Sequence, residues 1–159
     1  MSAAEELAAR LGLRPHPEGG WYSEQHRSAQ TVSRDGVARA ALTSIYFLLA
    51  AGQHGRWHVV ASDEAWHHLD GDPLELLTWD PVTGVAGRAL LGPLRVAGCA
   101  PFALVPAHVW QAARPLGSHA LVGCTVGPGF DFADFRFVAD LPAHEQPFAG
   151  PLAPYRSLL

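Results

Sequence analysis

The chain has 159 residues, of which 48% are hydrophobic and 16% charged, and its formal net charge is −4. One domain with a substantial core is the simplest organisation at this length, and so few charges exclude a disordered acidic chain. All of the cations are arginines and they form no basic run. Nucleic acid and an anionic membrane are therefore poor candidate partners.

Cys99 and Cys124 form no Cys-x-x-Cys pair, and Cys124 lies in an apolar run. We interpret both as structural thiols of a reducing compartment. The N-terminus lacks the layout of a signal peptide, and the longest apolar run, around residues 45–51, is too short to cross a bilayer. We expect a soluble, cytoplasmic protein.

The first predicted element is a short helix within residues 1–13, because Ser2 and Glu5 form a capping box and Gly12 can end the helix. After it the chain consists of strands and turns, and residues 139–159 are predicted to be an extended C-terminal tail. About ten short strands separated by glycine or proline favour a sandwich or jelly roll in one domain, residues 1–159. The strands are expected at residues 21–26, 40–49, 56–60, 64–69, 74–79, 85–91, 102–105, 109–113, 119–126 and 132–138.

The segment 58–71 carries the densest set of reactive side chains. His58, Glu64, His67 and His68 lie within eleven residues, among Trp and Val rather than solvated charges. We interpret the segment as two strands joined by a tight turn at residues 61–63. On a β-hairpin these polar groups would converge in a sheet-lined pocket.

With these residues in place, the chain resembles the fifth family of the cupin superfamily, a domain family of unknown function. The resemblance runs from about residue 13 to residue 138 and implies an all-β double-stranded β-helix, the cupin jelly roll. It also implies a homodimer with a small-molecule ligand inside the barrel. The matching blocks are HPEGGWY (16–22), SIYFLL (44–49), SDEAWH (62–67), GDPLEL (71–76), VPAHVWQ (105–111) and VGCTVGPGFDFADF (122–135).

The cupin metal set of three His and one Glu is incomplete in this chain. His58 and Glu64 fit the pattern, but Val60 replaces the second His and Gln111 replaces the third. A catalytic first-row metal needs several good donors, and an amide oxygen is a weak one. No cofactor is favoured; a divalent metal, if bound, would use His58, Glu64 and Gln111, with His68 as a substitute ligand.

The leading hypothesis is a metal-independent isomerase or epimerase of a small polar molecule, sugar-like or anionic. His58 would be the general base, Glu64 would orient it, and Tyr46 would be the acid, because Tyr46 alternates with Ser44 and Leu48 along a strand. The choice of an isomerase or epimerase rests on analogy with the sugar epimerases that have the cupin fold. The residues expected to bind the ligand are Trp66, His68, His108, Gln111 and Arg56, the cationic ones for an anionic group.

Two other functions stay open at this stage. One is a metal-dependent cupin enzyme, a dioxygenase or an isomerase, and the other is a non-catalytic binding protein, so the sequence leaves catalysis undecided. Tyr22, Glu24 and His26 share one strand face and could line a pocket mouth or decorate an edge strand. Asp131 and Asp134 could close a lid or bind the backbone of a partner.

Overall fold

The computed structural model describes residues 1–159 and begins with helix α1 (Ala3–Leu11). The predicted capping box is formed: Ser2 Oγ accepts a hydrogen bond from the Glu5 amide, and the Glu5 carboxylate accepts one from the Ser2 amide. Gly12 ends the helix in the left-handed conformation, with φ 65°. The apolar face of α1 packs against the six-stranded sheet, around Leu48 of strand β5 (Thr43–Ala50).

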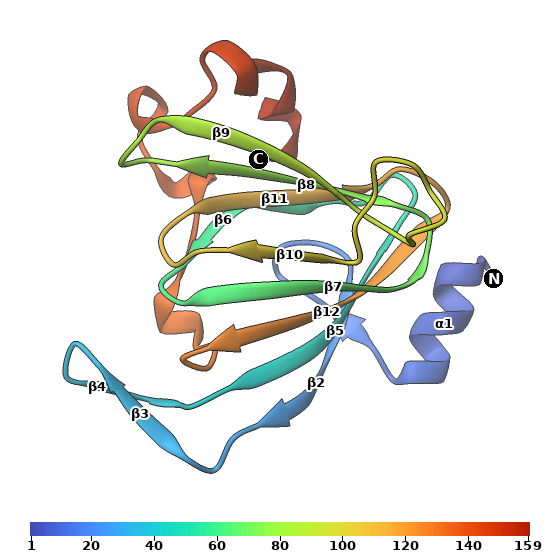
Figure 1. The fold of residues 1–159 in the computed structure, drawn as a ribbon, viewed down its shortest axis with the longest axis horizontal. Helices are drawn as coiled ribbons and strands as arrows, with labels where there is room; N and C mark the ends of the chain where they lie inside the picture. The colour runs from blue at the N-terminus through green and yellow to red at the C-terminus, as the bar shows by residue number, and fades with distance from the viewer.

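Two antiparallel sheets form the jelly roll expected from the sequence (Figure 1). The strand order is β1-β2-β5-β12-β7-β10 in the six-stranded sheet and β13-β6-β11-β8-β9 in the five-stranded sheet. The strands are β1 (Arg14–Pro15), β2 (Trp21–Arg27), β3 (Thr31–Arg34), β4 (Val37–Ala40), β5 (Thr43–Ala50), β6 (Gly55–Val60), β7 (Asp63–Gly71), β8 (Leu74–Asp80), β9 (Val85–Leu91), β10 (Phe102–Val105), β11 (Trp110–Pro115), β12 (His119–Gly127) and β13 (Phe135–Phe137).

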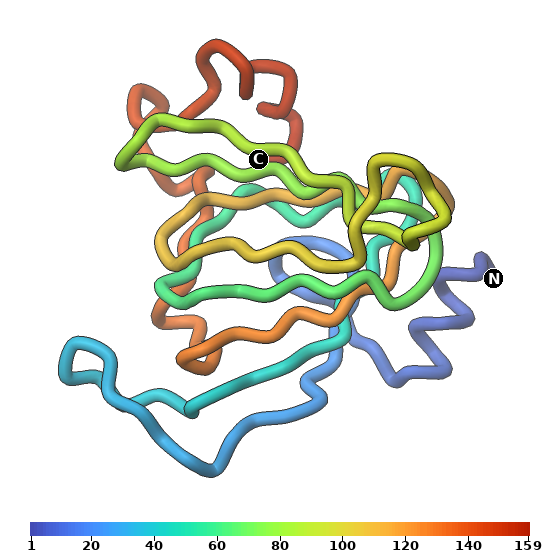
Figure 2. The backbone as a smooth tube through the Cα atoms, in the orientation of Figure 1, coloured from blue at the N-terminus to red at the C-terminus, as the bar shows by residue number.

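Strands β3 and β4 form a separate hairpin that projects from the body of the molecule (Figures 1 and 2). The sequence pattern had predicted only a single strand that begins at residue 40, so this hairpin was not expected. Asp35 and Gly36 make its turn with φ values of 51° and 80°. An Asp-Gly pair between two short strands is a strong hairpin signal, because the turn needs positive φ at both positions.

The predicted β-hairpin across residues 58–71 is wrong. Strand β6 belongs to the five-stranded sheet and β7 to the six-stranded sheet, so the chain crosses from one sheet to the other at the turn between them. His58 and Glu64 therefore reach the interior from opposed sheets rather than from neighbouring strands.

The C-terminal segment is not extended as predicted but winds through 3-10 turns, the longest being η4 (Gly150–Leu158). Its apolar side chains cover the outer face of the five-stranded sheet, where Trp57 is fully buried and its indole N–H donates to the Tyr155 carbonyl at 3.0 Å. In Figure 1 this red segment lies beside β6, β8 and β9. The tail thus completes a second core outside the barrel.

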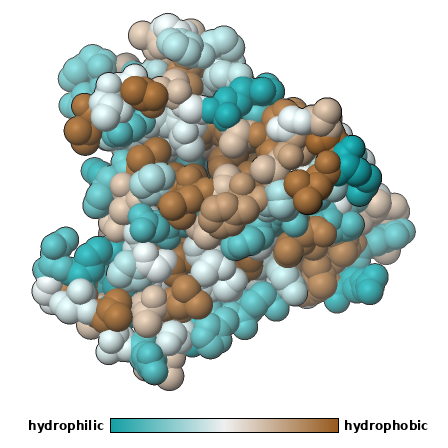
Figure 3. Space-filling model, in the orientation of Figure 1, coloured by the Kyte–Doolittle hydropathy of each residue, from teal (hydrophilic) through white to brown (hydrophobic).

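The main core lies between the sheets, around Phe47 and Trp66. The outer face of β10 is less covered, since Phe102 and Leu104 are about half exposed there. Figure 3 shows apolar side chains gathered on this side of the molecule. The one α-helix has nine residues, and no helix is long and apolar enough to cross a membrane.

Candidate functional site

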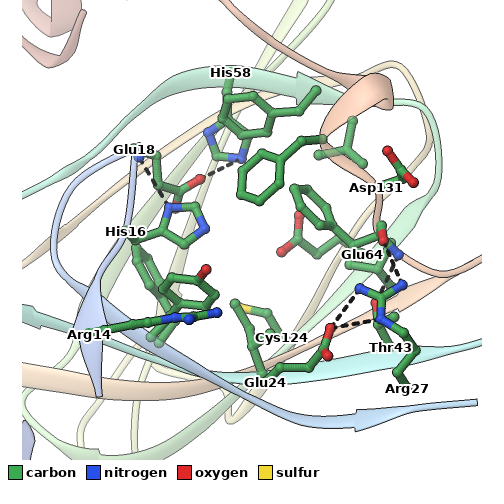
Figure 4. A pocket seen from close by; sticks show the side chains of 18 residues that line it. Arg14, His16, Glu18, Glu24, Arg27, Thr43, His58, Glu64, Cys124 and Asp131 are labelled. Carbon is green, nitrogen blue, oxygen red and sulfur yellow. Dashed lines mark hydrogen bonds and ion pairs between the residues drawn. The ribbon is translucent and has the colours of Figure 1, made fainter.

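A cavity of about 360 Å³ opens between the two sheets (Figure 4). Its walls come from β1, β2, β5, β7 and β12 of the six-stranded sheet, from β6, and from the two loops at residues 16–18 and 130–135. The lining side chains are Arg14, His16, Glu18, Tyr22, Glu24, Arg27, Thr43, Ile45, Phe47, His58, Val60, Glu64, Cys124, Val126, Phe130, Asp131, Phe132 and Phe135.

Glu18 is placed in the cavity by the glycines around it. Gly19 and Gly20 have φ values of 117° and 69°, and a Cβ would collide with the His54 carbonyl at Gly19 and with the Leu48 carbonyl at Gly20. A Cβ at Gly55 would come within 3.1 Å of Glu18 Oε1. Because these positions carry no side chain, the loop lies directly on β6, where the Arg56 amide donates to the Glu18 carbonyl at 2.8 Å.

Glu18 and His58 form a buried pair. His58 Nε2 lies 3.1 Å from Glu18 Oε2, and His58 Nδ1 lies 2.7 Å from the Arg56 carbonyl. The carbonyl can only accept, so Nδ1 carries the ring proton and Nε2 is an acceptor in the neutral ring. The partner of His58 is therefore Glu18, not Glu64 as the sequence suggested.

Burial disfavours the charged form of both members of this pair. Loss of hydration lowers the pKa of His58 to about 4, against a smaller opposing effect of its bond to the Arg56 carbonyl. Burial, and after it the charge of Glu64, raises the pKa of Glu18 well above its usual value. The protonated Glu18 carboxyl thus donates to His58 Nε2.

His16 supports this arrangement from the entrance side. Its Nδ1 accepts the Glu18 amide at 3.1 Å, and its ring packs edge-on against Tyr22 and Phe47, with centroids 4.6 and 5.5 Å away. Burial, followed by the proximity of His58, lowers the pKa of His16 to about 4. The neutral His16 ring therefore carries its proton on Nε2.

Glu64 reaches into the same cavity from β7 (Figure 4). Gln111 Nε2 donates to Glu64 Oε2 at 2.6 Å, and Gln111 Oε1 accepts the Trp66 indole N–H at 3.0 Å. An indole nitrogen is only a donor, which fixes the orientation of the Gln111 amide. Burial raises the pKa of Glu64 to about 7, while hydrogen bonds from Gln111 and Cys124 oppose the rise. Glu64 thus changes charge near neutral pH inside the cavity.

The mouth of the cavity is polar and aromatic. Arg27 binds Glu24 at 2.6 Å and donates to the Phe130 carbonyl at 3.2 Å, while the Arg14 guanidinium lies 5.1 Å from the centre of the Tyr22 ring. Tyr22 and Glu24 line the cavity, which is one of the two placements that the sequence left open. A register shift between Glu24 and His26 interrupts the alternation, and His26 does not line the cavity.

Loop 130–135 supplies the remaining aromatic wall. Phe135 stacks on the His58 ring at 5.0 Å between centroids, with the two planes inclined by 20°. Phe130 and Phe132 pack edge-on against each other and against Phe135. The cavity thus combines titratable carboxyl and imidazole groups with a wall of apolar aromatic rings.

The prediction that Tyr46 is the general acid of this site is wrong, because Tyr46 does not line the cavity. Strand β5 turns Ile45 and Phe47 toward the cavity, so Tyr46 points the other way and packs with the cluster around Ala4 and Ala8 of α1. The Tyr46 hydroxyl is on the outer face of the sheet and does not line the cavity.

None of the five predicted ligand-binding residues lines the cavity. Gln111 is hydrogen-bonded to Glu64 and Trp66 to Gln111, whereas the other three lie away from Glu64. His68 Nε2 is 3.1 Å from the Asp72 carbonyl, beside a register shift of β7, and His68 does not line the cavity. The Arg56 guanidinium stacks 4.3 Å from the centre of the Phe137 ring. His108 is exposed and lines a separate, smaller hollow.

The sequence analysis did not select His16, Glu18 or Cys124 for the site. Cys124 was interpreted as a structural thiol; it is free and buried, but its side chain lines the cavity near Glu64 and Glu18. The sequence did contain a feature that could have identified Glu18, namely its position before two glycines. Glycines allow the backbone to approach another strand closely, and such a contact can place the preceding carboxyl in the cavity.

The residues available for a cupin metal do not fit one. No group of three or more His, Cys, Asp or Glu is arranged to hold a metal ion. Gln111 Oε1, the atom that would have to bind the metal, accepts from Trp66, and both His58 nitrogens face oxygens of Arg56 and Glu18. The set His58, Glu64 and Gln111 is thus committed to hydrogen bonds within the protein.

Comparisons with known proteins place the chain in a family. Two solved structures are each 34% identical to it: a hypothetical protein from Leishmania major (98% of this chain and 94% of that one, TM-score 0.80) and a protein from Shewanella oneidensis (86% and 85%, TM-score 0.78). A dTDP sugar isomerase from Desulfovibrio desulfuricans shares the fold, with 13% identity, 80% and 89% coverage and a TM-score of 0.55. No curated protein matched. The Cupin_5 family model, described as Cupin superfamily (DUF985), matches residues 5–138, and the chain belongs to this family.

Proposed function

We propose that this protein is a metal-independent isomerase or epimerase of a small, neutral, sugar-like molecule, and that Glu64 is the residue that moves the proton. The observation that carries the proposal is a buried carboxyl, lining the cavity, with a pKa of about 7. A general acid–base group works best when its pKa lies near the operating pH, because both protonation states are then populated.

Glu18 supplies the second proton site of this mechanism. It is protonated and hydrogen-bonded to His58, and Figure 4 shows this pair on one side of the cavity while Glu64 enters from another. Ionised Glu64 would remove a proton from a carbon next to a carbonyl, which leaves an enediolate. Glu18 would then donate its proton to the opposite face of that carbon, which gives the neutral epimer and a Glu18 carboxylate. Glu64 thus gains a proton from the substrate and Glu18 loses one to it. Exchange with solvent then removes the proton from Glu64 and returns one to Glu18.

His58 then has a different role from the base assigned to it by the sequence analysis. Its pKa of about 4 makes it a weak base at neutral pH, but its Nε2 holds the Glu18 proton in place. We therefore assign Glu64 as general base, Glu18 as general acid and His58 as the positioning residue for Glu18.

The lining favours a neutral ligand over an anionic one. The cations Arg14 and Arg27 are matched in number by Glu24 and Asp131, and Arg27 is bound to Glu24. Arg56, which the sequence analysis assigned to an anionic group, points elsewhere. Aromatic walls are suited to the apolar faces of a sugar ring.

The similarity to a dTDP sugar isomerase agrees with this proposal only at the level of the fold. Unrelated reactions use one fold, so the argument rests on the carboxyl geometry.

Hydrogen exchange at carbon tests the proposal. The protein is incubated in D2O with a panel of neutral aldoses and ketoses, and proton NMR follows the loss of the C–H signal next to the carbonyl. We expect exchange with at least one sugar, and Glu64→Gln should slow it by about 100-fold or more. Glu145→Gln, a substitution at an exposed glutamate outside the cavity, is the matched control and should leave the rate unchanged. Binding without exchange across the panel would contradict the proposal.

A further inference from the structure

We propose that His16 is a third catalytic group of the cavity, whose Nε2–H binds the carbonyl oxygen of the substrate and stabilises the enediolate formed from it. The inference rests on the proposed function and narrows its substrate class to sugars with a free carbonyl group, which are open-chain aldoses and ketoses and keto-sugars. It is carried by a hydrogen-bond donor that is held in place, lines the cavity and donates to no group of the protein.

The His16 ring is held by contacts of its side chain and of its backbone. Nδ1 accepts the Glu18 amide, so the proton of the neutral ring is on Nε2. The His16 amide donates to the Gly20 carbonyl, and the His16 carbonyl accepts the Gly19 amide, each at 3.0 Å. Phe132 adds to the aromatic contacts of the ring, with centroids 6.4 Å apart. A donor fixed in this way needs no reorientation when charge develops on a ligand, which is what electrostatic catalysis requires.

The Nε2 atom of His16 is open to the cavity. It makes no hydrogen bond within the protein, whereas every fully buried polar side-chain atom has a partner. Nε2 is therefore accessible, and His16 lines the cavity. Other interior donors are engaged, since the Gln111 amide and the Cys124 thiol both donate to Glu64. His16 thus offers an N–H that an oxygen of a ligand can accept.

His16 and Glu64 enter the cavity from opposite sides, His16 from the loop at residues 16–18 and Glu64 from β7 (Figure 4). When Glu64 removes a proton from the carbon next to a carbonyl, negative charge moves onto the carbonyl oxygen. A substrate between the two residues would present its C–H bond to Glu64 and that oxygen to His16. A hydrogen bond to the developing oxyanion lowers the barrier of such a step.

His16 takes part in this step without giving up its proton. Burial lowers its pKa to about 4, so the ring is a neutral imidazole at neutral pH and its Nε2–H is a hydrogen-bond donor rather than an acid. The protons that move are still the one that Glu64 gains and the one that Glu18 loses, and the balance of the reaction is unchanged.

The alternative is a structural role, because His16 also holds the Glu18 loop through Nδ1, and two substitutions separate the roles. The Asn amide oxygen accepts the backbone N–H two residues on, so His16→Asn keeps a partner for the Glu18 amide and loses the donor at Nε2. The longer Gln side chain brings an N–H to the place of Nε2, so His16→Gln keeps the donor and loses the acceptor.

The first readout is the rate of C–H exchange in D2O with a sugar that the wild type processes. We expect His16→Asn to slow exchange by about 100-fold, the usual loss for one oxyanion donor, and His16→Gln to stay within about tenfold of the wild type. His144→Asn, at an exposed histidine outside the cavity, is the matched control and should leave the rate unchanged. A wild-type rate in His16→Asn, or equal losses in the two His16 variants, would overturn the inference and leave the proposed reaction standing.

Binding of arabinonohydroxamate, a neutral mimic of an enediol, gives a second readout that needs no turnover. Calorimetric titration should show that His16→Asn weakens binding about tenfold and that His16→Gln weakens it less. This order of affinities in a protein that exchanges no sugar would keep His16 as a ligand donor and reject the proposed reaction. Equal affinity of the wild type and His16→Asn, or no binding at all, would overturn the inference.

Discussion

The Nε2 atom of His58 lies 3.1 Å from Oε2 of Glu18, and this contact joins the N-terminal loop to strand β6 inside the cavity. Both groups are neutral in this pair, because burial disfavours an imidazolium and a carboxylate alike. The charge that varies near neutral pH is therefore on Glu64, which makes the cavity sensitive to pH through one residue.

The pKa of Glu64 predicts how the stability of the protein depends on pH. Its folded pKa of about 7 is above the usual 4.5, so its contribution is fully present below pH 4.5 and is lost as pH rises through 7. The cost at high pH reaches roughly 3 kcal/mol. Denaturant unfolding at several pH values should show the wild type losing stability relative to Glu64→Gln between pH 5 and 8. A pH-independent difference would contradict the raised pKa.

The lowered pKa of His58 predicts that the stability of the protein falls as the pH becomes more acidic. Its folded pKa is lowered from 6.5 to about 4, so its contribution is present above 6.5 and is lost as pH falls toward 4. In the same unfolding experiments, the stability advantage of the wild type over His58→Asn should shrink as pH falls through this interval. An advantage that grows in acid would mean that His58 is charged in the folded protein.

Substitution of Gln111 should lower the stability of the protein strongly, although Gln111 does not line the cavity. Gln111→Leu removes partners from the Trp66 indole and from Glu64 at once, and each unsatisfied buried group costs about 1–3 kcal/mol. Urea unfolding should show this loss, whereas Gln25→Leu, at an exposed position of β2, should change stability little. Equal effects of the two substitutions would show that the chain from Trp66 to Glu64 is not formed.

Gly20 and Gly84 offer a matched pair for testing the loop that carries Glu18. Both have φ 69°, but a Cβ at Gly20 would collide with the Leu48 carbonyl, whereas a Cβ at Gly84 meets nothing within 4 Å. Alanine at either position adds the same backbone strain, so Gly20→Ala should lower the melting temperature further. It should also slow exchange catalysis, because the loop must shift and carry Glu18 away from His58.

Tyr46→Phe should leave catalysis unchanged, since the hydroxyl lies on the outer face of β5. The measurement is the rate of C–H exchange with a sugar that the wild type processes. A large loss of rate with unchanged stability would place the hydroxyl in the mechanism and contradict the geometry.

Most strands of the two sheets and the cavity-facing positions of His58 and Glu64 were predictable, because short apolar runs between glycines and prolines define strands, and alternation selects faces. The β3–β4 hairpin, with few apolar residues, was not. Tyr46 was assigned to the wrong face because β5 is apolar on both sides. One side covers the cavity and the other is covered by α1, so alternation alone does not distinguish them. Glu18 was missed because the two glycines after it indicate a close approach of the backbone but do not identify the strand that it meets, and the burial of Glu18 depends on contact with β6.

The most direct test of the account is the titration of the Glu64 carboxyl by carbon NMR, assigned with Glu64→Gln. The account predicts a midpoint of about 7, set by burial against the bonds from Gln111 and Cys124. In the same spectra the midpoint of Glu18 should lie well above the usual 4.5. A Glu64 midpoint near the usual 4.5 would contradict the assignment of Glu64 as the group that moves the proton.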